Sequence, residues 1–546
     1  MTARDSVTPQ VLVAGSGPVG LTVAHELTRR GVRVRLVDKA PGPAETSRAT
    51  AVHARTMEVF HQMGVLDRLL PRGQRVRHFS MHRNGRRLVR FDTNYDKLST
   101  RFPFSLMVGQ VVTEEILRDA LKDLGVEPEW GVALEGFEQE GDGVTAALSH
   151  ADGTRETVSV PWLVGTDGAH SVARATLGLR LLGESSETWL NADIEIEPDL
   201  QRDSNHLLHT GNGTILMIPF PEPGKWRAVD TVDTDGAEDW EHIRARMERK
   251  ISYALRRPVK VSPPSWVSRF TAQQRMIQRM NVNRVFLAGD AAHVHSPASG
   301  QGMNTGIQDA YNLGWKLADV ANGYADRRLL ESYGAERVPI GERLLKTTKT
   351  ATGLVALRNI ALPVVLPVGM FVLNTAKPLK RRIEGKIMRG ISGLALEYPA
   401  TPLVLDSSPR SLVRPGARVG CDGPTERNEA GWRALCAEEF PDPRWTLLAF
   451  PDGSASQEAA VRDAESRFGG AVSVRTVCRD TRTETGARPL ADPGGALARH
   501  FDASPGEFVL VRPDGYLAGK ARLGVRDVEA ALGKVHLTPA GQSRAD

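Results

Sequence analysis

The hydrophobic pattern of the first 40 residues predicts a strand, a helix and a second strand in close succession. The apolar run Val11–Ala14 reads as a short buried strand, and a glycine-rich turn follows at residues 15–20. Apolar residues recur at helical spacing over 21–27, and an alternating pattern over 32–36 predicts the second strand, which ends at Asp38.

Two later strand patterns end in a similar way. Residues 162–164 predict a strand that runs into an Asp-Gly turn at 167–168, and residues 285–288 predict another that ends in Gly-Asp at 289–290. A new helical pattern opens near 300–304. Taken alone, the Asp-Gly turn is better explained as an ordinary turn with a helix-capping serine.

The remainder of the chain divides into an antiparallel region and a carboxyl-terminal unit. Residues 206–232 alternate between apolar and polar positions and contain glycine and proline turns, which predicts antiparallel strands. A stretch rich in proline, serine and glycine follows residue 399 and marks a boundary. Beyond it the pattern predicts, in order, strand 445–450, helix 458–468, strand 471–478, a strand pair within 507–520 and helix 525–535.

Composition narrows the class of protein. With 546 residues, of which 41% are hydrophobic and 25% charged, the chain is globular and too long for one core. The net charge of +5 is small and scattered, so no nucleic-acid partner is expected. The three cysteines have neither disulfide nor zinc spacing, and no secretion signal opens the chain, so a reducing cytoplasm is expected.

One uncharged stretch, residues 359–376, raises the question of a membrane contact. Two prolines and a glycine interrupt it, and its unbroken apolar part is shorter than the roughly 20 residues that cross a bilayer. We therefore expect a buried or interface segment and no membrane partner.

The first glycine turn carries the pattern of a dinucleotide site. Bare glycines let the backbone approach a pyrophosphate at the helix N-terminus, and an acid at the end of the next strand accepts hydrogen bonds from a ribose. This motif does not choose between NAD and FAD. The residues expected on the nucleotide are Gly15, Ser16, Gly17, Pro18, Val19, Gly20, Asp38 and Lys39.

The last motif favours a flavin. Asp290 at the end of a strand suits a ribityl hydroxyl, and the glycine-opened helix at 300–304 offers free amides and a partial positive charge. A reduced flavin is an anion on its pyrimidine edge, so such a helix end stabilises it.

In this order and combination, the three motifs resemble those of the class A flavoprotein monooxygenases, the para-hydroxybenzoate hydroxylase-like group, over about residues 8–395. The resemblance implies an α/β fold with a Rossmann-like FAD-binding domain and an antiparallel-sheet substrate domain. The last part resembles the thioredoxin-like extension of phenol hydroxylases and aromatic polyketide hydroxylases, without a CxxC motif. The expected division is FAD-binding 1–175, substrate sheet 176–280, FAD-binding and helical 281–398, and thioredoxin-like 399–546.

The resemblance also implies roles for individual residues. Arg48 lies by the flavin, Gln110 lies on the ribityl chain, and the carbonyl of Pro297 faces the reactive edge, so Arg48 and Pro297 are the catalytic candidates. The family usually has glycine where this chain has Ser299, which leaves that turn open. Further residues assigned to the flavin are Asp167, Gly289, Asp290, Gly300, Gly302, Met303 and Asn304.

Other interpretations of single residues remain. Arg48 and Arg55 stand where a helix pattern begins and read otherwise as a solvated helix start. His293 and His295 suggest a metal, but two histidines at this spacing without an acidic pair are poor ligands, so no metal is expected.

The expected function is that of an FAD-dependent monooxygenase. It would consume NADPH or NADH and molecular oxygen and hydroxylate a polycyclic aromatic polyketide through a flavin C4a-hydroperoxide, in secondary metabolism. Baeyer–Villiger or epoxidising oxygenation on the same scaffold stays open. A pyridine-nucleotide dehydrogenase and a flavin-binding protein without turnover are the weaker alternatives. The partner is a small aromatic molecule, and a homodimer is left open.

Overall fold

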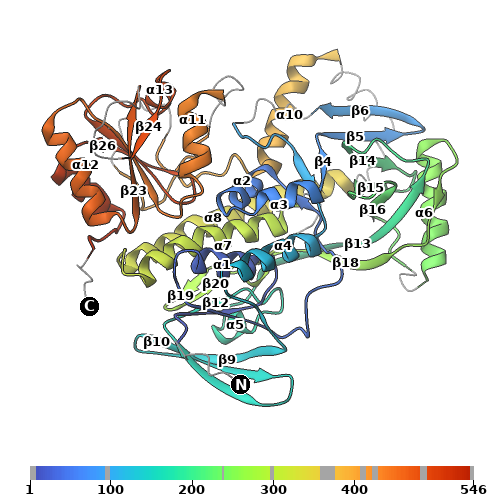
Figure 1. The fold of residues 1–546 in the computed structure, drawn as a ribbon. Helices are drawn as coiled ribbons and strands as arrows, with labels where there is room; N and C mark the ends of the chain where they lie inside the picture. Colours follow the sequence, from blue (N-terminus) through green and yellow to red (C-terminus); the bar gives the residue numbers. More distant parts are fainter. Residues whose placement is uncertain are drawn as a thin grey trace.

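The computed structural model describes residues 8–92, 99–235, 239–295, 300–356, 375–405, 414–420, 428–479 and 488–540. Its ribbon shows a parallel sheet, a large antiparallel sheet and a separate carboxyl-terminal sheet, with long helices between them (Figure 1). The mixed α/β class expected from the sequence is confirmed.

The parallel sheet brings the three sequence motifs to one edge. Its strand order is β19-β20-β12-β1-β2-β8, and β12 pairs in parallel with both β1 and β20. Because parallel strands present their carboxyl ends at the same edge, the turns that follow β1, β12 and β20 meet there. The strands are β1 (Val11–Ala14), β2 (Val34–Asp38), β8 (Glu129–Trp130), β12 (Trp162–Gly165), β20 (Val285–Leu287) and the antiparallel edge strand β19 (Asn281–Val282).

Helices α1 (Pro18–Thr28) and α7 (Gly302–Ala321) pack tightly against each other beside this sheet. A Cβ added at Gly314 of α7 would lie only 2.6 Å from the Cβ of Glu26 on α1, so the close approach needs glycine there. Shorter helices complete this part of the fold: α2 (Ala54–Gln62), α3 (Leu66–Leu69), α4 (Gln110–Asp123) and α5 (Val172–Thr176).

Two small sheets flank the nucleotide-binding part. One is the antiparallel trio β9 (Val132–Glu140), β10 (Gly143–His150) and β11 (Arg155–Val160). The other joins β3 (Ala51–Val52), β4 (Gln74–Val76) and β7 (Ser105–Met107).

The large sheet has the order β21-β18-β13-β16-β15-β14-β5-β6, with β17 paired to β13. Two of its strands, β5 and β6, come from within segment 1–175, which the sequence predicts to belong to the FAD-binding part. Helix α6 (Trp240–Leu255) covers one face through Ile243, Met247 and Ile251. The strands are β5 (His78–Arg83), β6 (Arg86–Asp92), β13 (Leu182–Glu197), β14 (Ser204–His209), β15 (Thr214–Pro219), β16 (Lys225–Asp230), β17 (Lys260–Val261), β18 (Trp266–Met276) and β21 (His293–Val294).

Helices α8 (Glu331–Ala356) and α10 (Lys377–Ser392) follow α7 along the chain. The uncharged stretch at 359–376 lies outside the described residues except for its last two positions. Within the described part of the chain, no helix combines the length and the apolar character needed to cross a membrane.

The carboxyl-terminal unit is a five-stranded sheet with helices on both faces. Its order is β24-β23-β22-β25-β26, parallel from β24 to β22 and antiparallel from β22 to β26. In Figure 1 it lies across α7 and α8 from the large antiparallel sheet. The elements are α11 (Ala430–Ala434), β22 (Trp445–Phe450), α12 (Ala455–Phe468), β23 (Val472–Cys478), β24 (Pro489–Ala491), α13 (Ala496–Phe501), β25 (Glu507–Val511), β26 (Leu517–Arg522) and α14 (Val525–Lys534).

Candidate functional site

A continuous cavity of about 1230 Å³ opens where the three motifs meet. It runs from the edge of the parallel sheet, past the starts of α2 and α7, to the inner face of the antiparallel sheet and the end of α10. This volume exceeds the roughly 300–1,000 Å³ of a site for one small ligand. The lining includes these sequence-predicted residues: Gly15, Gly17, Pro18, Val19, Asp38, Lys39, Arg48, Gln110, Asp167, Asp290, Gly300, Gly302, Met303 and Asn304.

The remaining predicted residues lie behind this wall or outside the described chain. Ser16, Gly20 and Gly289 support the lining from the protein side. Pro297 and Ser299 fall outside the described residues. The roles assigned to these two residues therefore stay predictions.

The glycines of the first turn have different structural roles. Gly15 has φ +101°, and a Cβ there would lie 2.5 Å from the carbonyl oxygen of Thr166 on the neighbouring strand end. A Cβ at Gly20 would lie 1.8 Å from the carbonyl oxygen of Gly15. At Gly17 a Cβ would meet nothing within 4 Å. The first two glycines thus allow close packing inside the protein, whereas Gly17 leaves free space at the N-terminus of α1, where an anion binds favourably.

Asp38 ties this turn to the end of β2. Its Oδ2 accepts hydrogen bonds from the backbone nitrogen (2.6 Å) and hydroxyl (2.9 Å) of Ser16, and its Oδ1 accepts one from the nitrogen of Ala40 (2.9 Å). The carboxylate also borders the cavity. It therefore stands at the distance from the glycine turn that a ribose beside a pyrophosphate requires.

Asp167 has a clear structural task. Its carboxylate accepts hydrogen bonds from the hydroxyl of Ser171 (2.5 Å) and the nitrogen of Ala173 (3.0 Å), and Ser171, the N-cap of α5, accepts one from the nitrogen of Arg174 (2.9 Å). Asp167 and Gly168 still line the cavity. The capping interpretation and the ligand-facing position therefore coexist.

The turn after β20 is held from behind by a buried carboxylate. Asp309 on α7 accepts hydrogen bonds from the nitrogen of Gly289 (3.2 Å), from Nε2 of His293 (2.6 Å) and from Nε of Arg337 (2.6 Å). Although burial opposes ionisation, Arg337 and His293 keep the pKa of Asp309 below its usual value. His293 thus serves the structure of the turn, and no group of three or more metal-type side chains occurs among the described residues.

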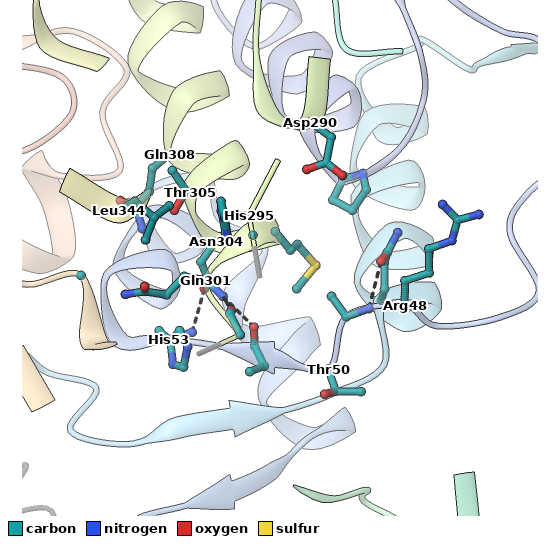
Figure 2. Close-up of a pocket in the computed structure, with 18 of the residues that line it drawn as sticks. Arg48, Thr50, His53, Asp290, His295, Gln301, Asn304, Thr305, Gln308 and Leu344 are labelled. Carbon is teal, nitrogen blue, oxygen red and sulfur yellow. Dashed lines mark hydrogen bonds between the residues drawn. The ribbon is translucent and has the colours of Figure 1, made fainter. Parts of the chain in front are cut away.

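Asp290, held by this turn, points into the cavity (Figure 2). Enclosure within the protein raises the pKa of its carboxyl, and the nearby positive charges of His293 and Arg48 oppose that shift. A hydrogen-bond donor on a ligand would stabilise the charged form of this carboxylate.

Residues 47–53 form the wall opposite Asp290. Asn304, near the start of α7, donates from Nδ2 to the carbonyls of Ala51 (2.7 Å) and Gly300 (2.8 Å) and accepts at Oδ1 from the nitrogen of His53 (2.9 Å), as Figure 2 shows in part. Gln110 accepts a hydrogen bond from the nitrogen of Ala49 (3.2 Å). These bonds fix the wall to the helix N-terminus and leave backbone groups facing the cavity.

Arg227 anchors the same segment from the antiparallel sheet. It forms a two-bond ion pair with Asp193 (2.8 Å each) and donates to the carbonyls of Ser47 (2.7 Å) and Arg48 (3.0 Å). Sequence spacing does not reveal this pair, because the two residues meet only when β13 and β16 are paired.

The solvated-helix interpretation of Arg55 is wrong. Its side chain is buried, with Nη1 donating to Glu58 (2.9 Å) and Nη2 donating to the carbonyl of Asp514 in the carboxyl-terminal unit (2.6 Å). By contrast Arg48 is exposed to the cavity.

The far end of the cavity is the inner face of the antiparallel sheet. Its wall is largely apolar and partly aromatic, and it also carries the polar residues His78, Asn191, Asn205 and Arg227. The apolar members of this wall include Phe79, Met81, Trp189, Leu207, Leu216, Ile218, Val229 and Phe270. Asparagine is uncommon in strands, so its occurrence at these two strand positions is the feature of the sequence that could have identified them as site residues.

The arrangement suits a dinucleotide with a flat ring system. The free space at Gly17 and the N-terminus of α1 suit the diphosphate, and Asp38 suits the ribose. Asp290 and the N-terminus of α7 suit the end of the ligand that carries the ring system. An apolar face then remains for a second, hydrophobic ligand.

Comparisons with known proteins agree with this geometry. The family described as FAD binding domain matches residues 8–348. A 6-methylpretetramide 4-monooxygenase of Streptomyces rimosus is 55% identical over 97% of this chain and 94% of its own. A 12-dehydrotetracycline 5-monooxygenase/anhydrotetracycline 6-monooxygenase of the same species is 31% identical over 82% and 95%. Among solved structures, the anhydrotetracycline hydroxylase OxyS of Streptomyces rimosus has a TM-score of 0.73 at 28% identity over 97% of this chain and 99% of its own.

Proposed function

This chain belongs to the FAD binding domain family and is an FAD-dependent monooxygenase, and from that premise we propose that it oxygenates a polycyclic aromatic polyketide of the tetracycline type in antibiotic biosynthesis. One atom of O₂ enters a C–H bond of the substrate as a hydroxyl. The other leaves as water, with NADPH or NADH and a proton supplying the electrons and hydrogen. The observation that carries the proposal is the continuity of the nucleotide end of the cavity with a broad apolar face.

The residues of the chain divide the work along this cavity. Gly17 and the N-terminus of α1 bind the diphosphate, Asp38 binds the adenosine ribose, and Asp290 with Gln110 binds the ribityl chain. FAD, once bound, supplies the redox and oxygen-transfer chemistry. The backbone amides at the start of α7 lower the energy of negative charge on the ring because they lie at the positive end of the helix.

Arg48 is proposed to face the ring from the opposite wall. Arg227 and Asp193 hold its backbone in place from the substrate sheet. A guanidinium at this position adds positive charge near the reacting region and so favours an anionic ring. The role of Pro297 at the reactive edge remains a proposal from family resemblance.

The apolar face orients the substrate and excludes water. Trp189, Leu216 and Val229 belong to one buried cluster on that face. A flat aromatic substrate buries its own surface there at about 25 cal/mol per Å². Exclusion of water protects the oxygen-transfer step from wasteful side reactions.

The finer features of the chain are proposed as follows. The domain limits are those expected from the sequence, except that strands β5, β6 and β21 join the substrate sheet, and the carboxyl-terminal unit is a thioredoxin-like domain without redox function. Its sheet with two parallel and two antiparallel neighbours, and helices on both faces, supports this proposal. Hydroxylation is favoured over Baeyer–Villiger or epoxidising chemistry because the structurally similar protein OxyS is named an anhydrotetracycline hydroxylase.

The test is product identification. The purified protein should be yellow with an FAD spectrum, and 6-methylpretetramide should stimulate its oxidation of NADPH. Mass spectrometry and NMR should show one added oxygen as a ring hydroxyl. A colourless protein that resists FAD reconstitution would refute FAD binding. Oxygen inserted into the ring skeleton would move the reaction to the Baeyer–Villiger class, and FAD binding without substrate-stimulated oxidation would indicate a flavin-binding protein without turnover.

A further inference from the structure

Two asparagine side chains on the inner face of the antiparallel sheet lack hydrogen-bond partners in the described part of the protein. Asn191 lies on β13 and Asn205 on β14, and both line the cavity. Among the described residues, the Oδ1 of Asn205 is buried without a partner, and the side chain of Asn191 makes no hydrogen bond either.

An unpaired amide in such a position needs an explanation. Leaving a buried polar group without its hydrogen bond costs about 1–3 kcal/mol, and most buried polar groups in proteins are paired. Asn191 lies between Val229 and Ser268 in the sheet, and Phe79 lies beside Asn205. None of these described neighbours forms a hydrogen bond with either amide. A ligand bound in the cavity would offer hydrogen bonds to these two side chains.

The strand register places the two asparagines on the same face of the sheet, three strands apart, with apolar residues between them. Asn191 shares a row across the sheet with Val229, Leu216 and Leu207 on the next three strands. Asn205 is two residues from Leu207 along β14 and so points to the same face. With strands about 4.8 Å apart and about 3.3 Å per residue, the Cα atoms of the two asparagines are about 14 Å apart across the strands and about 7 Å along them.

This separation limits the ligand that can contact both. The direct span between the two Cα atoms is about 16 Å from those two components. Between the two asparagines the wall is mostly apolar, and Arg227 also borders the cavity there. A ligand that matches it is long, flat and largely apolar in the middle, with oxygen atoms at its two ends.

Amides suit the oxygen pattern of such a molecule. Each asparagine side chain both donates and accepts hydrogen bonds. Neighbouring hydroxyl and carbonyl groups of a phenolic polyketide also do both, and they exchange roles when the molecule tautomerises. An amide can adapt to either form, whereas a carboxylate or an ammonium group cannot.

We propose that Asn191 and Asn205 are specificity-determining residues that bind the oxygen atoms at opposite ends of a linearly fused, multi-ring substrate and thereby select the ring presented for oxygenation. This inference rests on the proposed function and deepens it. The apolar wall provides most of the binding energy, and the two amides determine the register of the substrate on that wall.

The test compares Asn191→Leu, Asn205→Leu and the double variant with the wild-type holoenzyme. Leucine has nearly the shape of asparagine but no hydrogen-bonding groups. The matched control is Asn212→Leu, the same change at the exposed β14–β15 turn of the same sheet, outside the cavity. For each protein, FAD content, the Kd of 6-methylpretetramide from the change in flavin absorbance, and the position of the added oxygen are measured.

Each single cavity variant should raise the Kd about tenfold, which corresponds to one neutral hydrogen bond of about 1.4 kcal/mol. The double variant should raise it about a hundredfold, because sites this far apart act additively. FAD content should not change, and the single oxygenated product should become a mixture of positional isomers. Asn205→Ala, which places no branched group in the cavity, should weaken binding in the same direction.

Several outcomes would overturn the inference. A Kd within twofold of the wild type for both cavity variants, as expected for Asn212→Leu, excludes a substrate contact. Loss of FAD in step with loss of substrate binding indicates a purely structural role and overturns it as well. If the wild type does not bind 6-methylpretetramide at all, the proposed function fails first. Intact wild-type binding with unaffected variants refutes only this inference.

Discussion

Replacing Gly17 by alanine should lower the affinity for FAD and leave the stability of the apoprotein nearly unchanged. Gly17 is the N-cap of α1 with φ −68° and ψ −175°, a conformation that alanine adopts without strain. Its Cβ would meet no protein atom within 4 Å. The apoprotein should therefore lose no more than about 1 kcal/mol, since alanine is only a poorer N-cap than glycine, and its Tm should fall by no more than about 4 °C.

The same methyl group should interfere with the ligand. It would occupy the space in which the diphosphate approaches the backbone, and inserting a methyl into a filled site costs about 1–3 kcal/mol. The Kd for FAD should rise about 5- to 150-fold. The assay is titration of the apoprotein with FAD, followed by flavin fluorescence, alongside thermal unfolding monitored by circular dichroism.

Two further glycine variants serve as controls. Gly20→Ala would place its Cβ 1.8 Å from the carbonyl oxygen of Gly15, so this variant should lose stability whether or not FAD is present. Gly533→Ala on α14 also meets nothing within 4 Å but lies far from the cavity, so FAD affinity should not change. A folded Gly17→Ala protein that binds FAD within twofold of the wild type would refute the assignment of the diphosphate to this turn.

Three other substitutions test the charged groups. Asp290→Ala should lower FAD occupancy, measured by the absorbance ratio of flavin to protein, because a charge-assisted hydrogen bond of about 1.5–3 kcal/mol is lost; unchanged occupancy would reject the ribityl role. Burial raises the pKa of Asp319 in the folded protein to about 7. In the unfolded protein this carboxyl has its ordinary pKa of about 4, so between about pH 4 and 7 the folded state binds a proton that the unfolded state has released. The free energy of unfolding therefore falls as the pH rises from about 4 to 7. Asp319→Asn should remove this slope and stabilise the protein at pH 8 by on the order of 4 kcal/mol in denaturant unfolding; a parallel pH profile in both proteins would contradict it. Glu336→Gln should cost about 3–5 kcal/mol in the same assay, because the buried cations Arg512 and Lys316 lose their shared carboxylate; a wild-type unfolding midpoint would contradict this expectation.

The glycine–acid motifs allowed the positions of the ligand-binding turns to be predicted from the spacing of residues along the chain. Their chemistry is local: a short strand, a glycine turn and a helix N-terminus lie within about ten residues of one another. The order of parallel strands then follows from general rules of α/β sheets. For this reason the motif residues Gly17, Asp38 and Asp290, although far apart in the chain, could be expected at one site, and they border one cavity.

Side chains that act through pairing across the fold were not predictable in this way. Arg227 meets Asp193 because β16 pairs with β13, and Asp309 reaches Gly289 and Arg337 because α7 folds back along the sheet. The spacing of residues in the sequence does not predict these side-chain contacts. Buried Arg55 shows the same effect, since its partner Asp514 lies 459 residues away in the chain.

The sequence alone pointed to the cofactor end of this protein, because phosphate and ribose recognition depends on backbone shape over a few consecutive residues. The substrate end required the folded structure. Its wall is assembled from several strands whose mutual register depends on long-range pairing, and that register places Asn191 and Asn205 on one face, three strands apart. A pattern of alternation predicts that a residue faces inward, but the distances between inward-facing residues on different strands arise only when the sheet forms.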